Sequence, residues 1–381
     1  EGREPLVPRV RASSEAFFER CRDFSWEFFA EVFRRFVGQL EEETPPRYCS
    51  QLHGLQERFT AVLIIDGSRC AAMARRLKIL WNERAVVLPG CLLGVYDLFR
   101  GIPRQLYFCA DAAKAEMTRA KEALKDLRPD SLLVGDRLYC AAAFFAALTD
   151  QHLWGLFRRT KQLGVRRQEL LRKKRYRGGI LQEWLVSAGS GQTVPAQALR
   201  LIRFKQGGKV YELLTNVLDV KRLTAEEALE LYPCRWKVER MYYDLKEVLN
   251  LNRFYPANPN AVGMQVYAAA IVYAAMRVAQ GEVAEQVGIE PEEISPAKGF
   301  PKMAAACSNY AGRVLGVAEV VRLNPGVELR LPPWKRARFA QVSLDAILVE
   351  KRSEHRRKRR FCKARRQWKS LKHVRGGSKL T

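Results

Sequence analysis

Three acidic residues stand in patterns that could bring them to one site. Asp66 and Asp136 each follow a short apolar run rich in β-branched residues, so we predict that each ends a buried strand. Ligand-binding groups gather at the carboxyl ends of such strands in α/β sheets. Taken alone, either aspartate is more simply explained as a turn residue or a helix cap. The surroundings of the third acid, Glu239, decide between these interpretations.

Glu239 shares one predicted helix face with a phenol and two cations. Tyr232, Arg235 and Lys246 surround it in the sequence at helical spacing. At about 100° per residue, the four side chains fall within an arc of roughly 60°. This combination is unusual for a face that is merely solvated. Asp244, about 140° around the helix from Glu239, is predicted to be solvated instead.

Three converging carboxylates would suit the cleavage of a phosphodiester. Two divalent ions about 3.5 to 4 Å apart can activate the attacking hydroxyl and stabilise the departing oxygen. Mg²⁺ prefers oxygen ligands, and a few carboxylates together with substrate phosphates usually hold it. Arg235 and Lys246, beside Glu239, could then bind DNA phosphates, the arginine in bidentate fashion.

The positive charge of the chain is concentrated in two segments. The 381 residues include 66 Lys and Arg against 41 Asp and Glu, a net charge of +25. Residues 158–177 contain ten basic residues and one acid, and residues 351–381 contain fourteen and one. Such clusters attract polyanions and release counterions when they bind phosphates. Nucleic acid is therefore the first candidate partner, although charge alone leaves open a solvated tail, an anionic membrane surface or a ribosomal contact.

Composition narrows the class of protein further. Hydrophobic residues make up 48% of the chain, which is enough for a large core and excludes wholesale disorder. The nine cysteines are scattered and never form a C-x-x-C pair, so neither a zinc site nor a disulfide framework is expected, and a reducing compartment fits best. The longest clean apolar stretch, residues 266–276, is shorter than the roughly 20 residues a membrane span needs.

The elements that must position the acids indicate a mixed α/β core. The predicted strands are residues 59–65, 85–88, 92–96, 105–109 and 131–135, with helices at 112–127 and 138–148. A β-rich segment follows, with strands at 183–187, 198–205 and 209–218 and a hairpin signal at Gly207-Gly208. Thr224 and Glu227 form a capping box that opens a helical stretch, which Pro233 should kink or restart. Further helices are expected at 13–40, 261–280 and 302–321.

The spacing around Glu239 resembles the DDE transposases of bacterial insertion sequences, in particular the IS4-like group. The signature of that group, Tyr, two residues, Arg, three residues, Glu, six residues, Lys, is met at Tyr232, Arg235, Glu239 and Lys246. The first Asp of the family closes a hydrophobic strand, as in LIIDGS at 63–68, and the second precedes a helix, as in VGDRLY at 134–139. The resemblance covers residues 59–280.

The resemblance implies an RNase H-like mixed-sheet core of the α/β class, interrupted by a β-rich insertion, with a helical N-terminal segment and a basic C-terminal tail. The expected divisions are an N-terminal segment at 1–57, the first part of the core at 58–160, the insertion at 161–221, the second part with the catalytic helix at 222–285, and the C-terminal region at 286–381.

The implied activity is metal-dependent endonuclease cleavage of DNA at transposon ends, followed by strand transfer into target DNA. Asp66, Asp136 and Glu239 would be the catalytic residues and would ligate two Mg²⁺ ions, for which Mn²⁺ can substitute. The implied partners are double-stranded DNA, both transposon ends and target, and a second copy of the chain in a synaptic homodimer. A cytoplasmic bacterial protein at the nucleoid is expected, without a membrane partner.

The DNA contacts are divided between the helix and the insertion. By the resemblance, Tyr232, Arg235 and Lys246 would contact DNA near the scissile phosphate. We also predict that residues 158–177 line the DNA channel, with Arg172, Lys173 and Lys174 binding phosphates. Trp184 either packs in the core or stacks on a flipped base. The tail at 351–379 is either a phosphate-binding arm or a solvated end.

Two other classes of function remain as alternatives. A catalytically inactive DNA-binding protein descended from a transposase would shift DNA but cleave nothing in Mg²⁺ or Mn²⁺. An RNase H-like nuclease without strand transfer would give only hydrolysis products.

Overall fold

The computed structural model describes residues 14–69, 91–109, 116–189, 195–251 and 259–301. The chain divides into two compact units, Arg11–Val278 and a second unit whose described part is residues 279–301. Three predictions lie outside the described residues: the strand at 85–88, the helix at 302–321 and the basic tail at 351–381.

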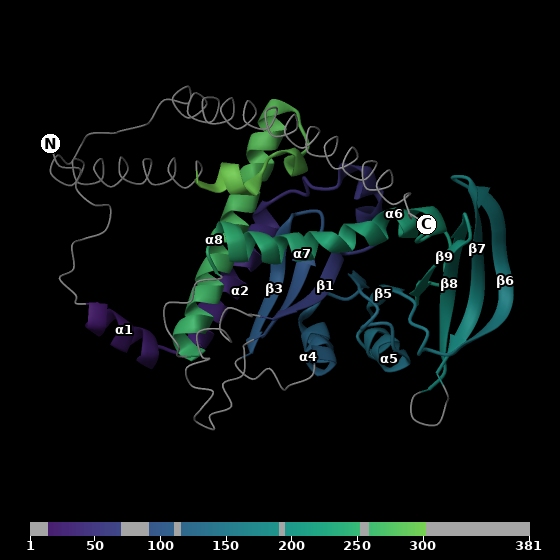
Figure 1. The fold of residues 1–381 in the computed structure, drawn as a ribbon, viewed down its shortest axis with the longest axis horizontal. Coiled ribbons are helices and arrows are strands. Elements are labelled where there is room, and N and C mark those ends of the chain that lie inside the picture. The colour runs from purple at the N-terminus through teal and green to yellow at the C-terminus, as the bar shows by residue number, and fades with distance from the viewer. Residues whose placement is uncertain (1–13, 70–90, 110–115, 190–194, 252–258, 302–381) are drawn as a thin grey trace, which may run out of the picture. The chain divides into compact units, whose positions relative to one another are not determined.

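A nine-stranded sheet lies at the centre of the first unit (Figure 1), in the order β3-β2-β1-β4-β5-β9-β8-β7-β6. Its strands are β1 (Val62–Arg69), β2 (Cys91–Asp97), β3 (Ile102–Cys109), β4 (Leu132–Gly135), β5 (Trp154–Arg158), β6 (Val165–Tyr176), β7 (Gly179–Ala188), β8 (Gln197–Gln206) and β9 (Lys209–Thr215). The pairs β1–β4 and β4–β5 are parallel, and all the others are antiparallel. The mixed α/β class predicted from the sequence is confirmed.

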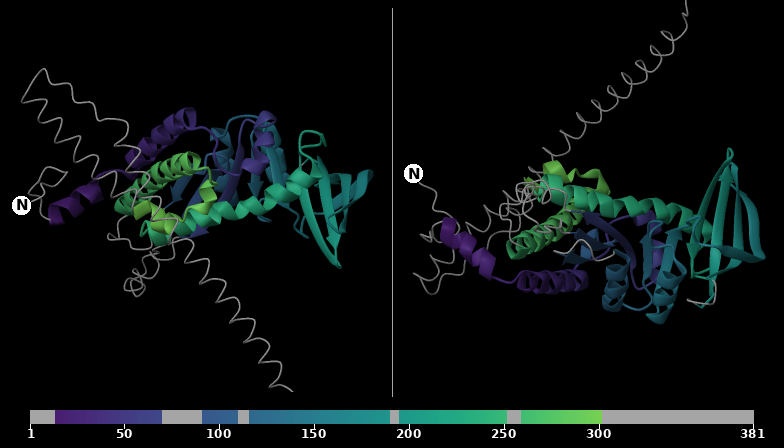
Figure 2. Two further views of the ribbon diagram at one scale, coloured as in Figure 1. Left: turned by 90° about the horizontal axis from the view of Figure 1, so that it is seen from above. Right: turned by 60° about the horizontal axis from the view of Figure 1, so that its bottom comes forward.

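Helices lie on both faces of the core part of this sheet, and the hairpins β6 to β9 project beyond them (Figure 2). One face packs on α4 (Glu116–Ala123) and α5 (Ala142–Asp150), where apolar side chains of alternate strand positions such as Leu63, Leu133 and Leu201 form the main core with Phe144. Because strand side chains alternate between the two faces, the residues next to Leu63 and Leu133 face the other way. That other face is covered by α7 (Trp236–Tyr243), which contacts β1 and β2.

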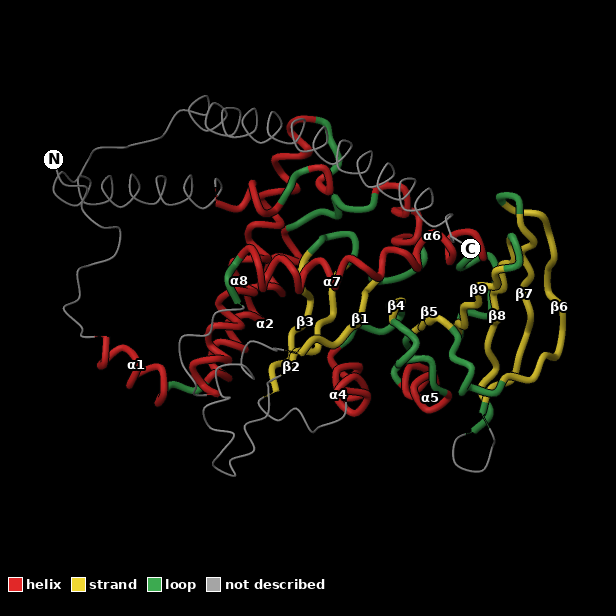
Figure 3. Tube along the Cα trace, viewed as in Figure 1, coloured by secondary structure: helices red, strands yellow, loops and turns green. Residues whose placement is uncertain are grey.

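Strands β6 to β9 extend the same sheet rather than forming a separate one (Figure 3). Strand β9 pairs with β5, so the hydrogen-bonded ladder is continuous from the core to the edge strand β6. The hairpin predicted at Gly207-Gly208 is confirmed, because both glycines have positive φ angles of 53° and 78°. The arginine-rich stretch, for which the sequence suggested no strand, is β6, and its turn to β7 also uses a positive φ at Gly178.

The segment that carries Glu239 departs from α-helical geometry at two places. The capping box of Thr224 and Glu227 opens α6 (Ala225–Leu231), as predicted. A 3₁₀ turn, η4 (Tyr232–Arg235), follows at Pro233 and leads into α7, which ends in a π turn, η5 (Asp244–Val248). The positions 232 to 246 therefore do not lie on one uniform α-helix.

Two further helices pack beside β3. These are α2 (Trp26–Glu43) and α8 (Pro259–Val287), and α1 (Ser14–Asp23) precedes α2. The Tyr267 hydroxyl donates to the Leu106 carbonyl at 3.0 Å, and the Tyr267 ring stacks on Trp26 at 5.9 Å between centroids. Short 3₁₀ helices η1 (Ser50–Glu57) and η3 (Leu124–Asp126) complete the described connections.

Helix α8 is long and apolar enough between Asn260 and Val287 to cross a membrane by length and composition, although half of its apolar window is buried. Its Arg277 is 7% exposed, donates to the Gly101 carbonyl at 2.9 Å and lies over the Tyr48 ring. These contacts are made by the part of α8 up to Val278, which belongs to the first unit.

The described part of the second unit is a small helical cluster. The Gln280 side chain donates to the carbonyls of Pro291 and Ile294, and Ala284 packs against Ile294. Pro291 begins the 3₁₀ helix η6 (Pro291–Glu293), and Ile294 follows directly after it.

Candidate active site

Asp66 lies on the face of β1 that α7 covers. The antiparallel pairing of β1 with β2 continues through Asp66 to Arg69, so the prediction that Asp66 ends its strand is wrong on this side. The parallel pairing with β4 stops earlier, at Ile64 with Val134. Asp66 is therefore held in register by β2 while its other side is open toward the end of β4.

Two side chains of the helical segment fix β1 at this point. The Tyr242 hydroxyl donates to the Asp66 carbonyl at 2.8 Å, and the Lys246 ammonium donates to the Ser68 hydroxyl at 2.7 Å. Gly94, opposite Asp66, leaves the space that the Tyr242 ring occupies, since a Cβ there would lie 2.7 Å from the Tyr242 hydroxyl oxygen. The π turn brings Lys246 over β1, with its ammonium 5.8 Å from the centre of the Tyr242 ring.

Asp136 follows β4 and continues toward the neighbourhood of Asp66. The β1–β4 register ends at Ile64 with Val134, and Asp136 follows two residues later. Its charge acts on the Asp66 carboxyl and raises the pKa of that group, so the two acids lie in one neighbourhood. Asp136 is half-buried, and its Oδ1 accepts from the Leu138 backbone N–H at 2.7 Å, which shapes the turn after the strand.

Arg235 connects the helix acid with the strand acid. Its Nη1 lies 2.8 Å from Glu239 Oε1 and 3.9 Å from Asp66 Oδ2, so a single nitrogen spans the gap between the two carboxylates. The Arg235 side chain is 11% exposed, and its guanidinium carbon stacks 4.5 Å from the centre of the Trp236 ring. The acids at 66 and 239, which are far apart in the sequence, therefore share one cation.

The electrostatics of Asp66 indicate a concentration of negative charge. Burial raises the pKa of the Asp66 carboxyl to about 7, and the nearby charges of Asp136, Glu239 and Glu116 act in the same direction. The Arg235 guanidinium opposes this rise without cancelling it. A cation that approaches Asp66 would lower this pKa, because it favours the ionised form of the carboxyl.

The chemistry of the donor set fits divalent cations, although the arrangement is not a finished metal site. No group of three or more His, Cys, Asp or Glu side chains is close enough to hold a metal ion among the residues that the structure describes. Three carboxylates offer only oxygen donors, the kind that Mg²⁺ prefers. The Arg235 guanidinium lies between two of these carboxylates, which is the place a cation would take.

Glu116 is a fourth acid whose charge acts on Asp66, from the α4 face of the sheet, and the sequence does not indicate it. Its carboxylate packs directly against Gly67, where any Cβ would clash with it, and accepts from the Tyr139 hydroxyl at 2.7 Å. Burial raises the pKa of Tyr139 well above its ordinary value, and Glu116 adds to the rise. The start of a helix after β3 was the available signal, but nothing in the spacing relates Glu116 to Asp66.

Tyr232 lies against the insertion rather than in the open. It is 7% exposed and packs edge-on against Tyr211 of β9, with 5.9 Å between ring centroids. Burial raises the pKa of Tyr232, whereas the charges of Arg235 and Arg158 oppose the rise. Arg158, at the end of β5, also lies over the Tyr211 ring at 5.0 Å. A phenol and two guanidinium groups thus border the carboxylates.

The three cations predicted on β6 point to different faces of the sheet. Arg172 lies 3.9 Å from Glu226 of α6, and Lys174 forms an ion pair with the same carboxylate. Lys173, between them, pairs across the strands with Gln182 on the opposite face and is exposed. The structure therefore brings two of these side chains to an acid of the protein and separates the third from them.

Asp244 and Trp184 differ in whether their predicted surroundings are correct. Asp244 is 1% exposed and paired with Arg240 at 3.0 Å, so the prediction that it is solvated is wrong. Burial raises its pKa, while Arg240 and Arg277 lower it. Trp184 packs against the main core beneath Arg167, whose guanidinium carbon lies 5.1 Å from the ring centre. This agrees with the packing interpretation of Trp184.

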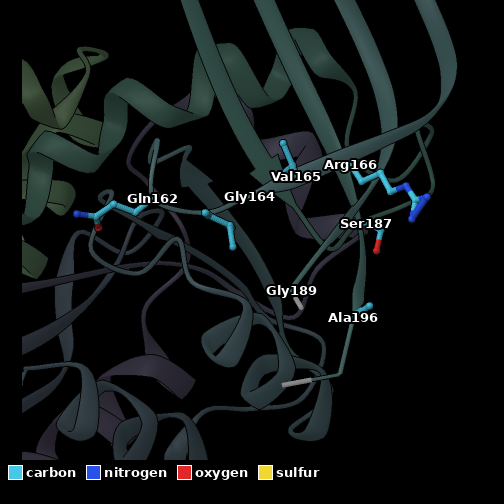
Figure 4. Close-up of a pocket in the computed structure, with 8 residues that line it drawn as sticks. Gln162, Gly164, Val165, Arg166, Ser187, Gly189 and Ala196 are labelled. Atoms are coloured by element: carbon cyan, nitrogen blue, oxygen red, sulfur yellow. The ribbon is translucent and has the colours of Figure 1, made fainter. Parts of the chain in front are cut away.

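The hollow shown in Figure 4 lies away from these acids. It measures about 730 Å³ and is lined by residues at the ends of β6 and β7 that include Arg166, Ser187 and Gly189. None of the four acids lines it. We therefore assign the candidate active site to the junction of β1, β4 and α7.

Comparison with known proteins gives matches to transposases. The family model described as "Transposase DDE domain" matches residues 92–275, which include Asp136 and Glu239. A protein of Sinorhizobium fredii named as a transposase, y4zB, is 29% identical over 281 residues, covering 72% of both chains. The transposase InsG of insertion sequence IS4 from Escherichia coli is 26% identical over 160 residues, which is 40% of this chain and 36% of that protein.

Among solved structures, a cryo-EM structure of a piggyBac transposase synaptic complex with hairpin DNA is similar with a TM-score of 0.38 and 11% identity, covering 74% of this chain and 57% of that chain. The sequence matches, together with the spaced motif, confirm the predicted resemblance. By sequence, this chain is similar to the DDE transposases of IS4-like insertion sequences.

Proposed function

We propose that this protein cleaves DNA at the ends of an insertion sequence and joins those ends to target DNA, in a reaction that requires divalent metal ions. The observation that carries the proposal is the Arg235 nitrogen shared by Glu239 and Asp66, which brings the helix acid to the strand acid. The transposase family gives the class of activity, and these side chains give the chemistry.

Asp66, Asp136 and Glu239 would hold two Mg²⁺ ions, or Mn²⁺ in their place. When bound, such ions activate the attacking hydroxyl and stabilise the departing oxygen of the phosphodiester. The remaining contacts would position the acids: Tyr242 and Lys246 hold β1 against the helical segment. We further propose that strands β1 to β5 with α4, α5 and α7 are an RNase H-like core and that β6 to β9 are the insertion.

Arg235, Tyr232 and Lys246 would contact DNA next to the reacting phosphate. Arg235 can form two parallel hydrogen bonds to a phosphate, because its guanidinium presents a planar fork of donors. Tyr232 and Arg158 border the same place, so a phosphate there would meet a phenol and two guanidinium groups. Lys173, on the exposed face of β6, would add a phosphate contact farther along the duplex.

The test is cleavage and joining of DNA that carries the terminal repeats of the element. We expect Asp66→Ala, Asp136→Ala and Glu239→Ala to abolish nicking in Mg²⁺, while binding of the same DNA in a gel-shift assay is retained. Asp150→Asn, an exposed acid at the end of α5, is the matched control and should cleave like the unaltered protein.

Cleavage by all three alanine variants would refute the assignment of the site. An unaltered protein that shifts DNA without cutting it in Mg²⁺ or Mn²⁺ would instead be a DNA-binding descendant of a transposase. If pre-cut ends are supplied and only hydrolysis products form, the protein is a nuclease that does not transfer strands.

A further inference from the structure

Arg235 occupies the position in which a metal ion would neutralise the acids. Its Nη1 is 2.8 Å from Glu239 and 3.9 Å from Asp66, and its side chain is only 11% exposed. A guanidinium cannot lose its charge in a protein, so the pairing persists at any pH at which the carboxylates are ionised. The close approach of the two carboxylates would otherwise be opposed by their mutual repulsion.

The same guanidinium cannot serve the acids and a divalent ion together. An ion bound between Asp66 and Glu239 would bring two further positive charges against Arg235, at a site where burial weakens the screening by water. An ion bound at Glu239 Oε1 would also compete with Arg235 for that oxygen. Entry of a metal ion at this place therefore requires that Arg235 move away.

A DNA phosphate offers Arg235 an alternative partner. The bidentate pairing of a guanidinium with a phosphate is as well matched as its pairing with a carboxylate. Trp236, on whose ring Arg235 stacks, is 62% exposed, so the guanidinium lies next to the open surface of α7. A short movement along this surface would exchange the carboxylates for a phosphate.

We propose that Arg235 closes the acidic site to metal ions until a DNA phosphate draws its guanidinium away, so that DNA and metal ions bind cooperatively. This inference rests on the proposed function, because it takes the acids as metal ligands. The coupling is reciprocal, since whatever DNA adds to the affinity for metal, metal must add to the affinity for DNA. The protein would thereby hold its metal ions firmly only when DNA is in place.

The experiment measures Mn²⁺ binding to the full chain without DNA, by the loss of the free Mn²⁺ signal in electron paramagnetic resonance. We expect Arg235→Gln to bind Mn²⁺ roughly 5- to 100-fold more tightly than the unaltered protein, the usual range for coupled sites. Lys125→Gln removes one charge from an exposed residue of η3, and should leave Mn²⁺ affinity within about twofold of the unaltered protein. Arg235→Lys keeps the charge and should bind Mn²⁺ weakly.

Reciprocity supplies a second measurement that does not depend on catalysis. Ca²⁺ should strengthen binding of a labelled duplex to the unaltered protein, followed by fluorescence anisotropy, and this gain should shrink in Arg235→Gln. Equal Mn²⁺ affinities for Arg235→Gln and the unaltered protein, with binding still abolished by Asp66→Asn, would overturn the closing role alone. If Asp66→Asn leaves Mn²⁺ binding to the Arg235→Gln variant unchanged, the acids are not metal ligands and the proposed function itself fails.

Discussion

Asp66 is held in surroundings that disfavour its charge. Its side chain is 16% exposed, it has acids on neighbouring elements, and burial raises its pKa to about 7 from the ordinary 3.8. A carboxyl with a raised folded pKa adds to stability below its unfolded pKa, and that contribution is lost as the pH rises through the folded value. The metal-free protein should therefore become less stable between about pH 4 and pH 7.

Replacing this carboxyl should reverse the loss. We expect Asp66→Asn to raise the free energy of unfolding at pH 8 by roughly 2 to 4 kcal/mol, because each pKa unit corresponds to about 1.4 kcal/mol. The gain should nearly vanish at pH 4. Urea unfolding in a chelating buffer at both pH values measures it, with Asp150→Asn as the control. A variant less stable than the unaltered protein at pH 8 would show that burial of the Asp66 charge is not costly.

Single residues were predictable from the sequence where spacing along one element fixed them. Arg235 and Glu239, four positions apart on the helical segment, do lie together. The nearness of Glu116 was not predictable, because it depends on how α4 packs against β1 at Gly67. The bridging position of Arg235 depends in the same way on the distance between a helix and a strand that are separated by more than 160 residues.

At the scale of elements, the basic strand β6 has two faces with different partners. Arg172 and Lys174 face Glu226 of α6, and Arg177, just past the strand, pairs with Glu230 at 2.6 Å. Acids of α6 therefore neutralise part of the positive charge of this strand. Because α6 leads directly into the segment that carries Glu239, the two regions are joined by ion pairs as well as by the chain.

Removing the acid should expose these cations to DNA. We expect Glu226→Gln to increase the affinity for duplex DNA and to steepen its salt dependence, by about 0.9 in slope for each phosphate newly contacted. Anisotropy titrations at several salt concentrations measure both quantities, and Glu122→Gln, an exposed acid of α4, is the control. Charge reversal at Arg172, Lys173 and Lys174 should do the opposite. An unchanged slope in that triple variant would remove β6 from the DNA interface.

Elements with a strong local signal were predicted well, and those whose form depends on tertiary contacts were not. The capping box at Thr224 and the hairpin at Gly207 need only local geometry, and both are present. The prediction that Asp244 is solvated is wrong because it assumes a uniform α-helix, whereas a π turn begins at Asp244. The sequence of strand β6 has no alternation of apolar residues, so the pattern does not predict a strand there. It is a strand because it pairs with β7 and not because one of its faces is buried.

At the scale of the whole molecule, the proposed function brings two DNA ends together. We expect the protein to form a complex with two copies of the chain and two terminal DNA fragments, as the resemblance to transposases implies. Native mass spectrometry of the Glu239→Ala variant, which should not cleave, measures the stoichiometry without turnover. The free protein serves as the reference. A complex with one chain and one fragment at every concentration would contradict synapsis by a homodimer.

The unbroken ladder from β3 to β6 has a consequence for how such a chain could be shortened. Strand β5 pairs with β4 on one side, and on its other side it pairs with β9. Deletion of residues 165–215 would leave the backbone groups on that side of β5 unpaired. Such groups can form hydrogen bonds with the same strand of another molecule. The hairpins therefore protect β5 from pairing with other molecules. A shortened chain without them would need another element to cover β5.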